Sequence, residues 1–296
     1  MRHPRHPVYV ISKGRADCCL TADFLTSDQT PFRLVVEPQE APEYASRYGS
    51  ARVLVLPFAN LGLGSIPARN WVMEHSISEG HARHWILDDN IRQLLYRHRG
   101  VRIACDSNIA LAAVEDFTAR YENIAVAGLQ YEMFVPNGTV ISPYLVNHHV
   151  YSCLLIDNTI PYRWRGRYNE DTDLCLQVIA GGLCTVLVNV FLASKVGTMT
   201  MKGGNSAELY RGDGRLKMAR SLERMWPGVV ETRRRFNRPQ HYVDWKKLRG
   251  TLKLKPGVDL SKLPATDSYG LELVALKEVR AESLKKLLRD QSPTPE

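Results

Sequence analysis

The chain lacks the features that mark membrane, secreted and zinc-binding proteins. Its longest nearly apolar run, residues 184–193, is too short to span a bilayer. Residues 1–7 contain no apolar segment, so no secretory signal is expected. The six cysteines form no C-x-x-C pair and no spacing typical of a zinc site. We therefore expect a soluble cytoplasmic protein, with no membrane partner, whose cysteines are reduced.

Positive charge is concentrated in one segment. The 296 residues carry a formal net charge of +8, and residues 211–255 contain fourteen Lys and Arg residues against four Asp and Glu residues. Such a segment is typical of a protein that binds a polyanion, although a solvated helical face gives the same composition. Aromatic side chains among the arginines could stack on bases. The residues predicted to contact DNA are Arg233, Arg234, Arg235, Arg238, His241 and Trp245.

Short apolar runs alternate with helical patterns in the first hundred residues. This order predicts a doubly wound, mostly parallel α/β sheet with ligands at the carboxyl ends of its strands. The expected strands are 8–12, 32–36, 52–56 and 84–87, and the expected helices are 16–26, 40–48 and 68–78.

The pattern then changes to strands without long helices between them, which predicts a smaller mixed section of sheet. We expect strands over 124–128, 139–146, 149–156 and 186–192, and helices over 107–121, 171–180 and 207–225. The predicted organisation is one domain over residues 1–248, with a nucleotide-binding half about 7–100 and an acceptor half about 101–248. Residues 249–296 form a predicted helical, basic C-terminal extension.

An apolar strand leads into two adjacent carboxylates, Asp88 and Asp89, which Asn90 follows. A strand end can hold both carboxylates in a cleft. In phosphate chemistry, Mg²⁺ and Mn²⁺ are held by one or two carboxylates together with the substrate phosphates. The pair therefore indicates a metal–diphosphate site. A solvated turn or a helix N-cap would use the same residue types, so both interpretations stay open at this point.

Two loops place arginine before this pair. Ser12 and Arg15 follow the first strand in the sequence Ser-Lys-Gly-Arg, where a turn at Gly14 could present them to a nucleotide. Arg69 and Asn70 follow a glycine-rich loop that is neither a Walker A motif nor a G-x-G-x-x-G fingerprint. Arg69 could bind a diphosphate through two N–H groups, or it could be a surface capping residue.

Three carboxylates stand at the start of the helix predicted over 171–180: Glu170, Asp171 and Asp173. Acidic side chains at this position cap a helix or complement its dipole. The functional alternative is that one of them acts as a general base toward an acceptor hydroxyl.

Taken in order, the motifs Ser-Lys-Gly-Arg, Pro-Ala-Arg-Asn, Trp-Ile-Leu-Asp-Asp-Asn and Asn-Glu-Asp-Thr-Asp-Leu resemble those of GT-A glycosyltransferases. They most closely resemble the TET/JBP-associated glycosyltransferases of phages. The segments 202–205 and 238–245 are also similar to that family, so the resemblance covers roughly residues 7–248. It implies a GT-A-like fold and transfer of a sugar from a nucleotide-sugar, with a UDP-sugar expected. The implied acceptor is 5-hydroxymethylcytosine, made in DNA by a TET-type dioxygenase in a phage-infected host cytoplasm.

The resemblance also implies the donor-side roles. Asp89 matches the carboxylate expected to bind Mg²⁺ or Mn²⁺, and Asp88 the one nearer the ribose, which also contributes to the metal site. Asn90 stands where many GT-A proteins have a further acid, which leaves open which carboxylate binds the metal directly. Arg69 matches the arginine on the diphosphate side. Further nucleotide-sugar contacts are expected at Ser12, Arg15, Asn70 and Lys202.

On the acceptor side, Asp171 matches the base of inverting relatives, with Glu170 and Asp173 as competitors for that role. Two alternatives to the DNA-modifying enzyme remain. One is a glycosyltransferase that acts on a protein or a small molecule, and the other is a non-catalytic DNA-binding module. The sequence favours no particular oligomeric state.

Overall fold

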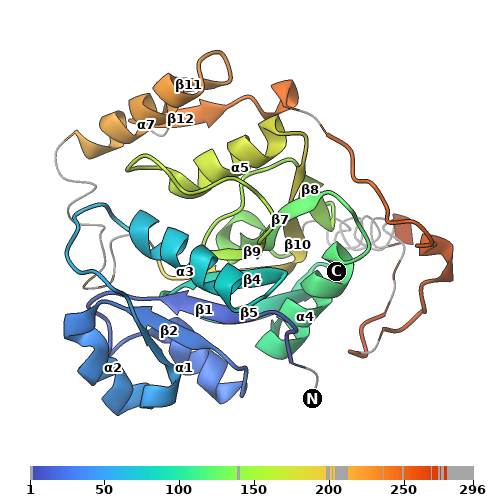
Figure 1. The fold of residues 1–296 in the computed structure, drawn as a ribbon. Helices are drawn as coiled ribbons and strands as arrows, with labels where there is room; N and C mark the ends of the chain where they lie inside the picture. The colour runs from blue at the N-terminus through green and yellow to red at the C-terminus, as the bar shows by residue number, and fades with distance from the viewer. Residues whose placement is uncertain are drawn as a thin grey trace, which may run out of the picture.

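The computed structural model describes residues 3–138, 141–197, 201, 203, 213–235, 237–248, 250–267, 269–272, 274, 277 and 278. One large sheet crosses the protein with the strand order β3-β2-β1-β4-β9-β7-β10-β5-β6, and β8 pairs with β10. Buried side chains form a core on each face of this sheet, one toward α1, α2 and α4 and the other toward α3 and α5 (Figure 1).

The first part of the sheet is parallel, as predicted. Each strand pairs in parallel with its neighbours, with β1 between β2 and β4, and β3 beyond β2. The side chains of β1 alternate between the two cores, so the strand is apolar throughout. These elements are β1 (Val8–Ile11), α1 (Leu20–Ser27), β2 (Arg33–Val36), α2 (Ala41–Tyr48), β3 (Val53–Val55), α3 (Ile66–Ser78) and β4 (Arg83–Asp88).

A hairpin that the sequence did not predict follows β4. Strands β5 (Ile91–His98) and β6 (Val101–Cys105) pair antiparallel and form the far edge of the sheet. Arg99 and Gly100 make the turn, both with positive φ, as a two-residue hairpin turn requires. Charged residues on the open face interrupt the apolar pattern, which hides these strands in the sequence.

The mixed section is confirmed. Strand β9 lies antiparallel to both β4 and β7, whereas β10 is parallel to β7 and antiparallel to β5 and β8. The elements are α4 (Ser107–Thr118), β7 (Ile124–Tyr131), β8 (Tyr144–Val146), β9 (Cys153–Asp157), α5 (Glu170–Ala180) and β10 (Cys184–Lys195). The α/β class with a parallel sheet and a smaller mixed section is therefore confirmed.

A small separate layer follows. Helix α7 (Gly214–Met225) packs on a hairpin of β11 (Val230–Arg235) and β12 (Arg238–Val243) through a cluster that includes Leu222, Val230 and Val243. The sequence had not assigned these two strands. The first part of the helix expected over 207–225 falls outside the described residues.

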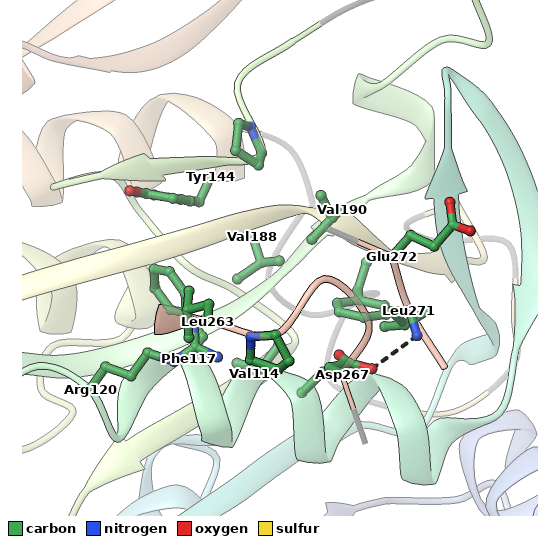
Figure 2. Close-up of a pocket in the computed structure, with 14 residues that line it drawn as sticks. Val114, Phe117, Arg120, Tyr144, Val188, Val190, Leu263, Asp267, Leu271 and Glu272 are labelled. Carbon is green, nitrogen blue, oxygen red and sulfur yellow. Dashed lines mark hydrogen bonds between the residues drawn. The ribbon is translucent and has the colours of Figure 1, made fainter. Parts of the chain in front are cut away.

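Residues 250–267 and 269–272 form an irregular segment, and Oη of Tyr269 donates to Oδ2 of Asp116 in α4 at 2.8 Å. The side chain of Asn123 holds it, donating to the carbonyl of Thr251 at 2.9 Å and accepting from the N–H of Lys253 at 2.9 Å. A largely apolar cavity of about 360 Å³ lies between this segment, α4 and β10 (Figure 2). None of the site residues predicted from the sequence lines it among the described residues. The helices expected over 261–290 lie mostly outside the described residues.

No helix in the described part of the chain is long and apolar enough to cross a membrane. All six cysteines are free thiols. Strands from both predicted halves share one sheet, and the proposed domain boundaries stay predictions.

Candidate active site

Asp88 ends β4, and three side chains donate hydrogen bonds to its carboxylate. Oδ1 accepts from Nη2 of Arg69 at 2.9 Å, while Oδ2 accepts from Nζ of Lys195 at 2.8 Å and from Oγ of Ser152 at 2.6 Å. Burial disfavours the ionised carboxylate, but Lys195 and Arg69 outweigh it and hold the pKa of Asp88 well below its usual range. Asp88 is therefore a fixed negative charge between two cations.

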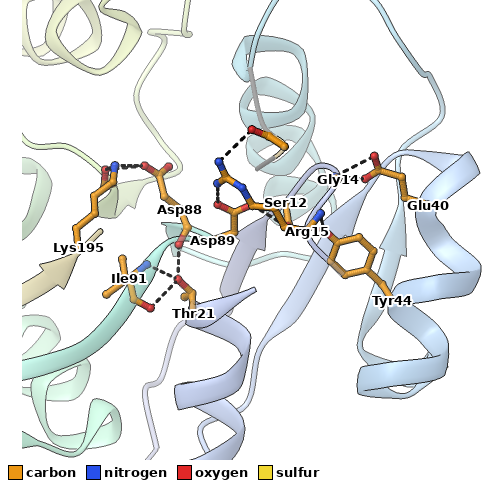
Figure 3. Close-up of polar contacts among 12 residues, drawn as sticks. Ser12, Gly14, Arg15, Thr21, Glu40, Tyr44, Asp88, Asp89, Ile91 and Lys195 are labelled. Carbon is orange, nitrogen blue, oxygen red and sulfur yellow. Dashed lines mark hydrogen bonds and ion pairs between the residues drawn. The ribbon is translucent and has the colours of Figure 1, made fainter. Parts of the chain in front are cut away.

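Asp89 points away from Asp88, toward the loop that follows β1 (Figure 3). Its Oδ2 accepts from Oγ of Ser12 at 2.7 Å, and Oδ1 pairs with Arg15. The hydroxyl of Tyr44 lies 2.6 Å from Oγ of Ser12 and accepts from the backbone N–H of Arg15 at 3.1 Å. The Ser-Lys-Gly-Arg loop thus builds a buried network around Asp89, and burial raises the pKa of this carboxyl.

The alternation of side chains along a strand explains why the two acids diverge. Trp85 and Leu87 face the core on the α1 side, and Ile86 faces the core on the α3 side. With a period of two, Asp88 continues the side of Ile86 and Asp89 the side of Leu87. Adjacent acids at this strand end therefore serve opposite faces of the sheet.

Lys195, at the end of β10, is a site residue that the sequence analysis missed. Besides Asp88, its Nζ donates to Oγ of Ser152 at 2.6 Å and to Oη of Tyr131 at 3.1 Å. Its side chain is 13% exposed. Burial favours the neutral amine, but Asp88 and Tyr131 more than offset it and raise the pKa of Lys195. No motif surrounds this lysine, and its only signal was its place at the end of a buried strand.

Arg69 joins Asp88 to the start of α5. It lies in the first turn of α3, where Pro67 needs no N–H partner. Its Nη1 is 3.1 Å from Oδ1 of Asp171, and its Nε is 4.0 Å from Oε1 of Glu170. The residue is only 3% exposed. Burial would lower the pKa of Arg69, but Asp171, Asp88 and Glu170 raise it. The end of β4 and the start of α5, far apart in sequence, thus meet around one guanidinium group.

Asp171 has an environment that suits a base. Oδ1 accepts from Nε1 of Trp164 at 3.1 Å, and Oδ2 accepts no hydrogen bond from the part of the chain that the structure describes. Burial, together with the neighbouring carboxylates Glu170 and Asp88, outweighs the lowering effect of Arg69 and raises the pKa of Asp171 to about 6. Near neutral pH the carboxyl is therefore ionised but close to its pKa, which favours proton transfer.

Two predicted site residues have structural partners instead. Asp173 is fully buried and accepts from Arg165 at 2.9 and 3.2 Å, from Gln177 at 2.8 Å and from Nε1 of Trp226 at 2.7 Å. These contacts leave Asp173 poorly placed to be a base. The other residue is Asn70.

The amide of Asn70 pairs with the backbone of Trp164. Its Nδ2 donates to the carbonyl at 2.8 Å, and its Oδ1 accepts from the N–H at 3.0 Å. Asn70 thus fixes the residue whose ring contacts Asp171. Its predicted contact with a nucleotide-sugar has no support from this geometry.

The family model described as TET-Associated Glycosyltransferase matches residues 6–204, about two thirds of the chain. The chain belongs to this family. The match includes every residue of the Asp88–Arg69–Asp171 cluster and confirms the resemblance seen in the motifs. This member of the TET-associated glycosyltransferase family is thus a glycosyltransferase, and its family implies a nucleotide-sugar donor.

Solved structures add distant similarity. A protein described as a nucleotide-diphospho-sugar transferase from Desulfovibrio desulfuricans G20 is 10% identical, with a TM-score of 0.37, covering 62% of this chain and 79% of that one. A197 from STIV is 12% identical, with a TM-score of 0.37, and the match covers 67% of this chain and 86% of that one. A search of the curated proteins gave no match.

The carboxylates of this family member do not fit a divalent metal ion as they stand. Asp88 already accepts from two cations, Asp89 faces the opposite side, and the described residues contain no group of three His, Cys, Asp or Glu side chains that could share a metal. Oδ1 of Asn90 is buried without a hydrogen-bond partner in the described chain. A neutral amide oxygen alone does not hold Mg²⁺ or Mn²⁺. The metal cofactor therefore stays a prediction.

The predicted DNA-binding arginines lie on the β11–β12 hairpin. The pairing of Arg235 with Arg238 and of Arg233 with Gln240 places these three arginines on one face of the hairpin, and all three are exposed. The guanidinium of Arg233 stacks on the ring of Tyr242 at 3.6 Å. This face therefore offers guanidinium groups in a row.

The other predicted DNA contacts lie elsewhere. Arg234 and His241 belong to the opposite hairpin face, together with the buried Val243, and burial lowers the pKa of His241. The ring of Trp245 stacks on His148 with centroids 5.4 Å apart. Arg234 is exposed, but His241 and Trp245 take part in packing.

Lys202 lies outside the described residues. Its neighbour Gly203 has a carbonyl that accepts from Nη2 of Arg15 at 3.2 Å, and a Cβ on Gly203 would lie 2.5 Å from the carbonyl oxygen of Gly14. Only glycine fits this approach, so two loops of the family pattern meet here.

Proposed function

We propose that this protein transfers a sugar from a nucleotide-sugar to the hydroxymethyl group of 5-hydroxymethylcytosine in DNA. The observation that carries the proposal is the bridge from Asp88 through Arg69 to Asp171, with contacts of 2.9 and 3.1 Å. It sets a cationic group beside a carboxyl suited to take a proton. The name of the family, which associates it with TET enzymes, supports an oxidised methylcytosine as the acceptor.

Arg69 would act on the leaving group. As the bond between the sugar C1 and the diphosphate oxygen breaks, its electron pair moves to that oxygen, and positive charge nearby stabilises the product. Arg69 Nη1 is buried and makes no aligned hydrogen bond within the described chain, although it lies near Asp171. Because this atom is buried, Arg69 would act on the leaving group through its positive charge. C1 becomes oxocarbenium-like, as in glycoside hydrolysis.

Asp171 would act on the acceptor. The hydroxymethyl oxygen forms the new bond to C1, and its proton passes to Oδ2 of Asp171. A direct displacement of this kind inverts the configuration at C1. Glu170, whose Oε1 accepts from Oγ of Ser65 at 3.1 Å, is the competing base.

The β11–β12 hairpin would hold the DNA. Its three aligned arginines suit phosphate contacts, which fix a duplex without reading its sequence. The hydroxymethyl group lies in the major groove of a duplex, and enzymes that act on a base often turn it out of the stack.

The test is sugar incorporation into DNA. The protein is incubated with UDP-glucose and other nucleotide-sugars and with matched oligonucleotides that contain cytosine, 5-methylcytosine or 5-hydroxymethylcytosine, and the DNA is digested to nucleosides for mass analysis. We expect a glycosylated nucleoside only from the hydroxymethylated DNA. Donor consumption in a cell extract without a modified nucleoside in any DNA would refute the DNA acceptor and favour a protein or small molecule.

A further inference from the structure

We propose that the ammonium group of Lys195, beside Asp88, takes the place of the divalent metal ion expected at the Asp88–Asp89 pair, so that this enzyme binds its nucleoside diphosphate and transfers sugar without Mg²⁺ or Mn²⁺. Only the activity part of this inference rests on the proposed function. The part that concerns nucleotide binding does not depend on the acceptor.

Lys195 is built into the site. Its Nζ reaches Asp88, Ser152 and Tyr131 at 2.8, 2.6 and 3.1 Å, so three partners fix it beside the carboxylate. The hydroxyl of Ser152 donates in turn to the same oxygen of Asp88 at 2.6 Å. A dication bound to this oxygen would meet the ammonium group at contact distance, and two like charges at such a distance repel strongly.

Asp88 has cationic partners without a metal. Lys195 and Arg69 both pair with its carboxylate, at 2.8 and 2.9 Å, while Asp89 pairs with Arg15. Because Asp89 turns to the opposite face, these two adjacent carboxylates do not point toward one metal ion (Figure 3).

The chemistry then needs no Lewis acid. The C1–oxygen bond breaks with its electron pair on the diphosphate, whose new charge Lys195 and Arg69 stabilise as fixed cations. The acceptor oxygen bonds to C1 and its proton goes to Asp171. Lys195 stays protonated throughout, since it acts by charge and transfers no proton.

The test is calorimetric titration of the full-length protein, dialysed against EDTA, with UDP, ADP, GDP, CDP and dTDP, each with and without MnCl₂. We expect one of them to bind in EDTA, with Mn²⁺ changing its Kd by less than about threefold. A Kd that Mn²⁺ tightens more than about tenfold, or binding seen only with Mn²⁺, would overturn the proposal.

Variants of Lys195 distinguish a role of its positive charge in nucleotide binding from a purely structural role. Lys195→Met should weaken binding in EDTA about tenfold or more, whereas Lys195→Arg should retain most of it. Because Lys195→Met removes the cation on Oδ2 of Asp88, Mn²⁺ should tighten binding by this variant, an effect that a purely structural lysine would not produce. Lys262→Met, at an 83% exposed lysine, is the matched control.

Two results from the variants count against the proposal: wild-type affinity of Lys195→Met in EDTA, and no response of that variant to Mn²⁺. If Lys195→Met does not fold, the wild-type titration with Mn²⁺ decides. Tight binding in EDTA without transfer to DNA would refute the proposed acceptor and leave the role of Lys195 supported.

Discussion

Replacing Asp171 with asparagine separates the stability of the site from its function. Asparagine keeps the shape of the side chain and an oxygen that can accept from Trp164, which now donates to Oδ1 at 3.1 Å. It removes the negative charge and the ability to take a proton. Asp171→Asn should therefore strongly reduce transfer while making the protein more stable near neutral pH.

The size of the stability change follows from the pKa. Burial and neighbouring acids raise the pKa of Asp171 from 3.8 to about 6. A native-state pKa raised by this amount costs about 3 kcal/mol of stability once the carboxyl is ionised, at about 1.4 kcal/mol for each tenfold change. The stability that the protonated carboxyl contributes is fully present below pH 3.8, where the group is protonated in both the folded and the unfolded state. This stability is lost as the pH rises through 6. The variant has no such loss.

The assay is urea unfolding of wild type and Asp171→Asn between pH 4 and pH 8, with transfer measured on the same samples. The stability difference should grow in favour of the variant between pH 4 and 6 and then level off. Transfer should fall by about 10²–10⁴. A variant that is less stable than wild type at pH 7, or one that retains turnover, would refute the reasoning.

Three further predictions concern the neighbours of this base and the β11–β12 hairpin. Arg69→Met should lower the free energy of unfolding by about 3–5 kcal/mol, measured by urea denaturation, because it leaves buried carboxylates without their partner; Arg69→Lys should lose less. Asp173→Asn should also destabilise, by about 2–4 kcal/mol, but should leave the Kd of the nucleoside diphosphate unchanged in calorimetry. Replacing Arg233, Arg235 and Arg238 with glutamine should weaken DNA binding and reduce the slope of log K against log salt concentration by about 3. An unchanged slope would contradict this prediction.

The sequence predicted the parallel half of the sheet well because its strands are buried on both faces. Val8 and Val10 enter one core and Tyr9 the other, so the strand is apolar throughout and easily recognised. Strands of the β5–β6 and β11–β12 hairpins have an open face. Their charged residues break the apolar run, and the positive φ of Arg99, Gly100 and Asn237 at the turns is evident only from the backbone.

The candidate site was predicted residue by residue but not as a geometry. Asp88, Arg69 and Asp171 were named from motifs, and the structure brings them together. That Asp88 and Asp89 face opposite sides follows from strand alternation, which an interpretation of the pair as one metal site overlooks. Lys195 has no motif because its role depends on β10 pairing beside β7, a contact between residues distant in sequence.

Sugar transfer to 5-hydroxymethylcytosine is tested most directly by the intact mass of a duplex that carries one such base, after incubation with the protein and UDP-glucose, then with other nucleotide-sugars. We predict that the mass rises by one sugar residue, and that the 5-methylcytosine duplex keeps its mass. An unchanged mass with every donor, from folded protein that binds a nucleoside diphosphate, would contradict the account.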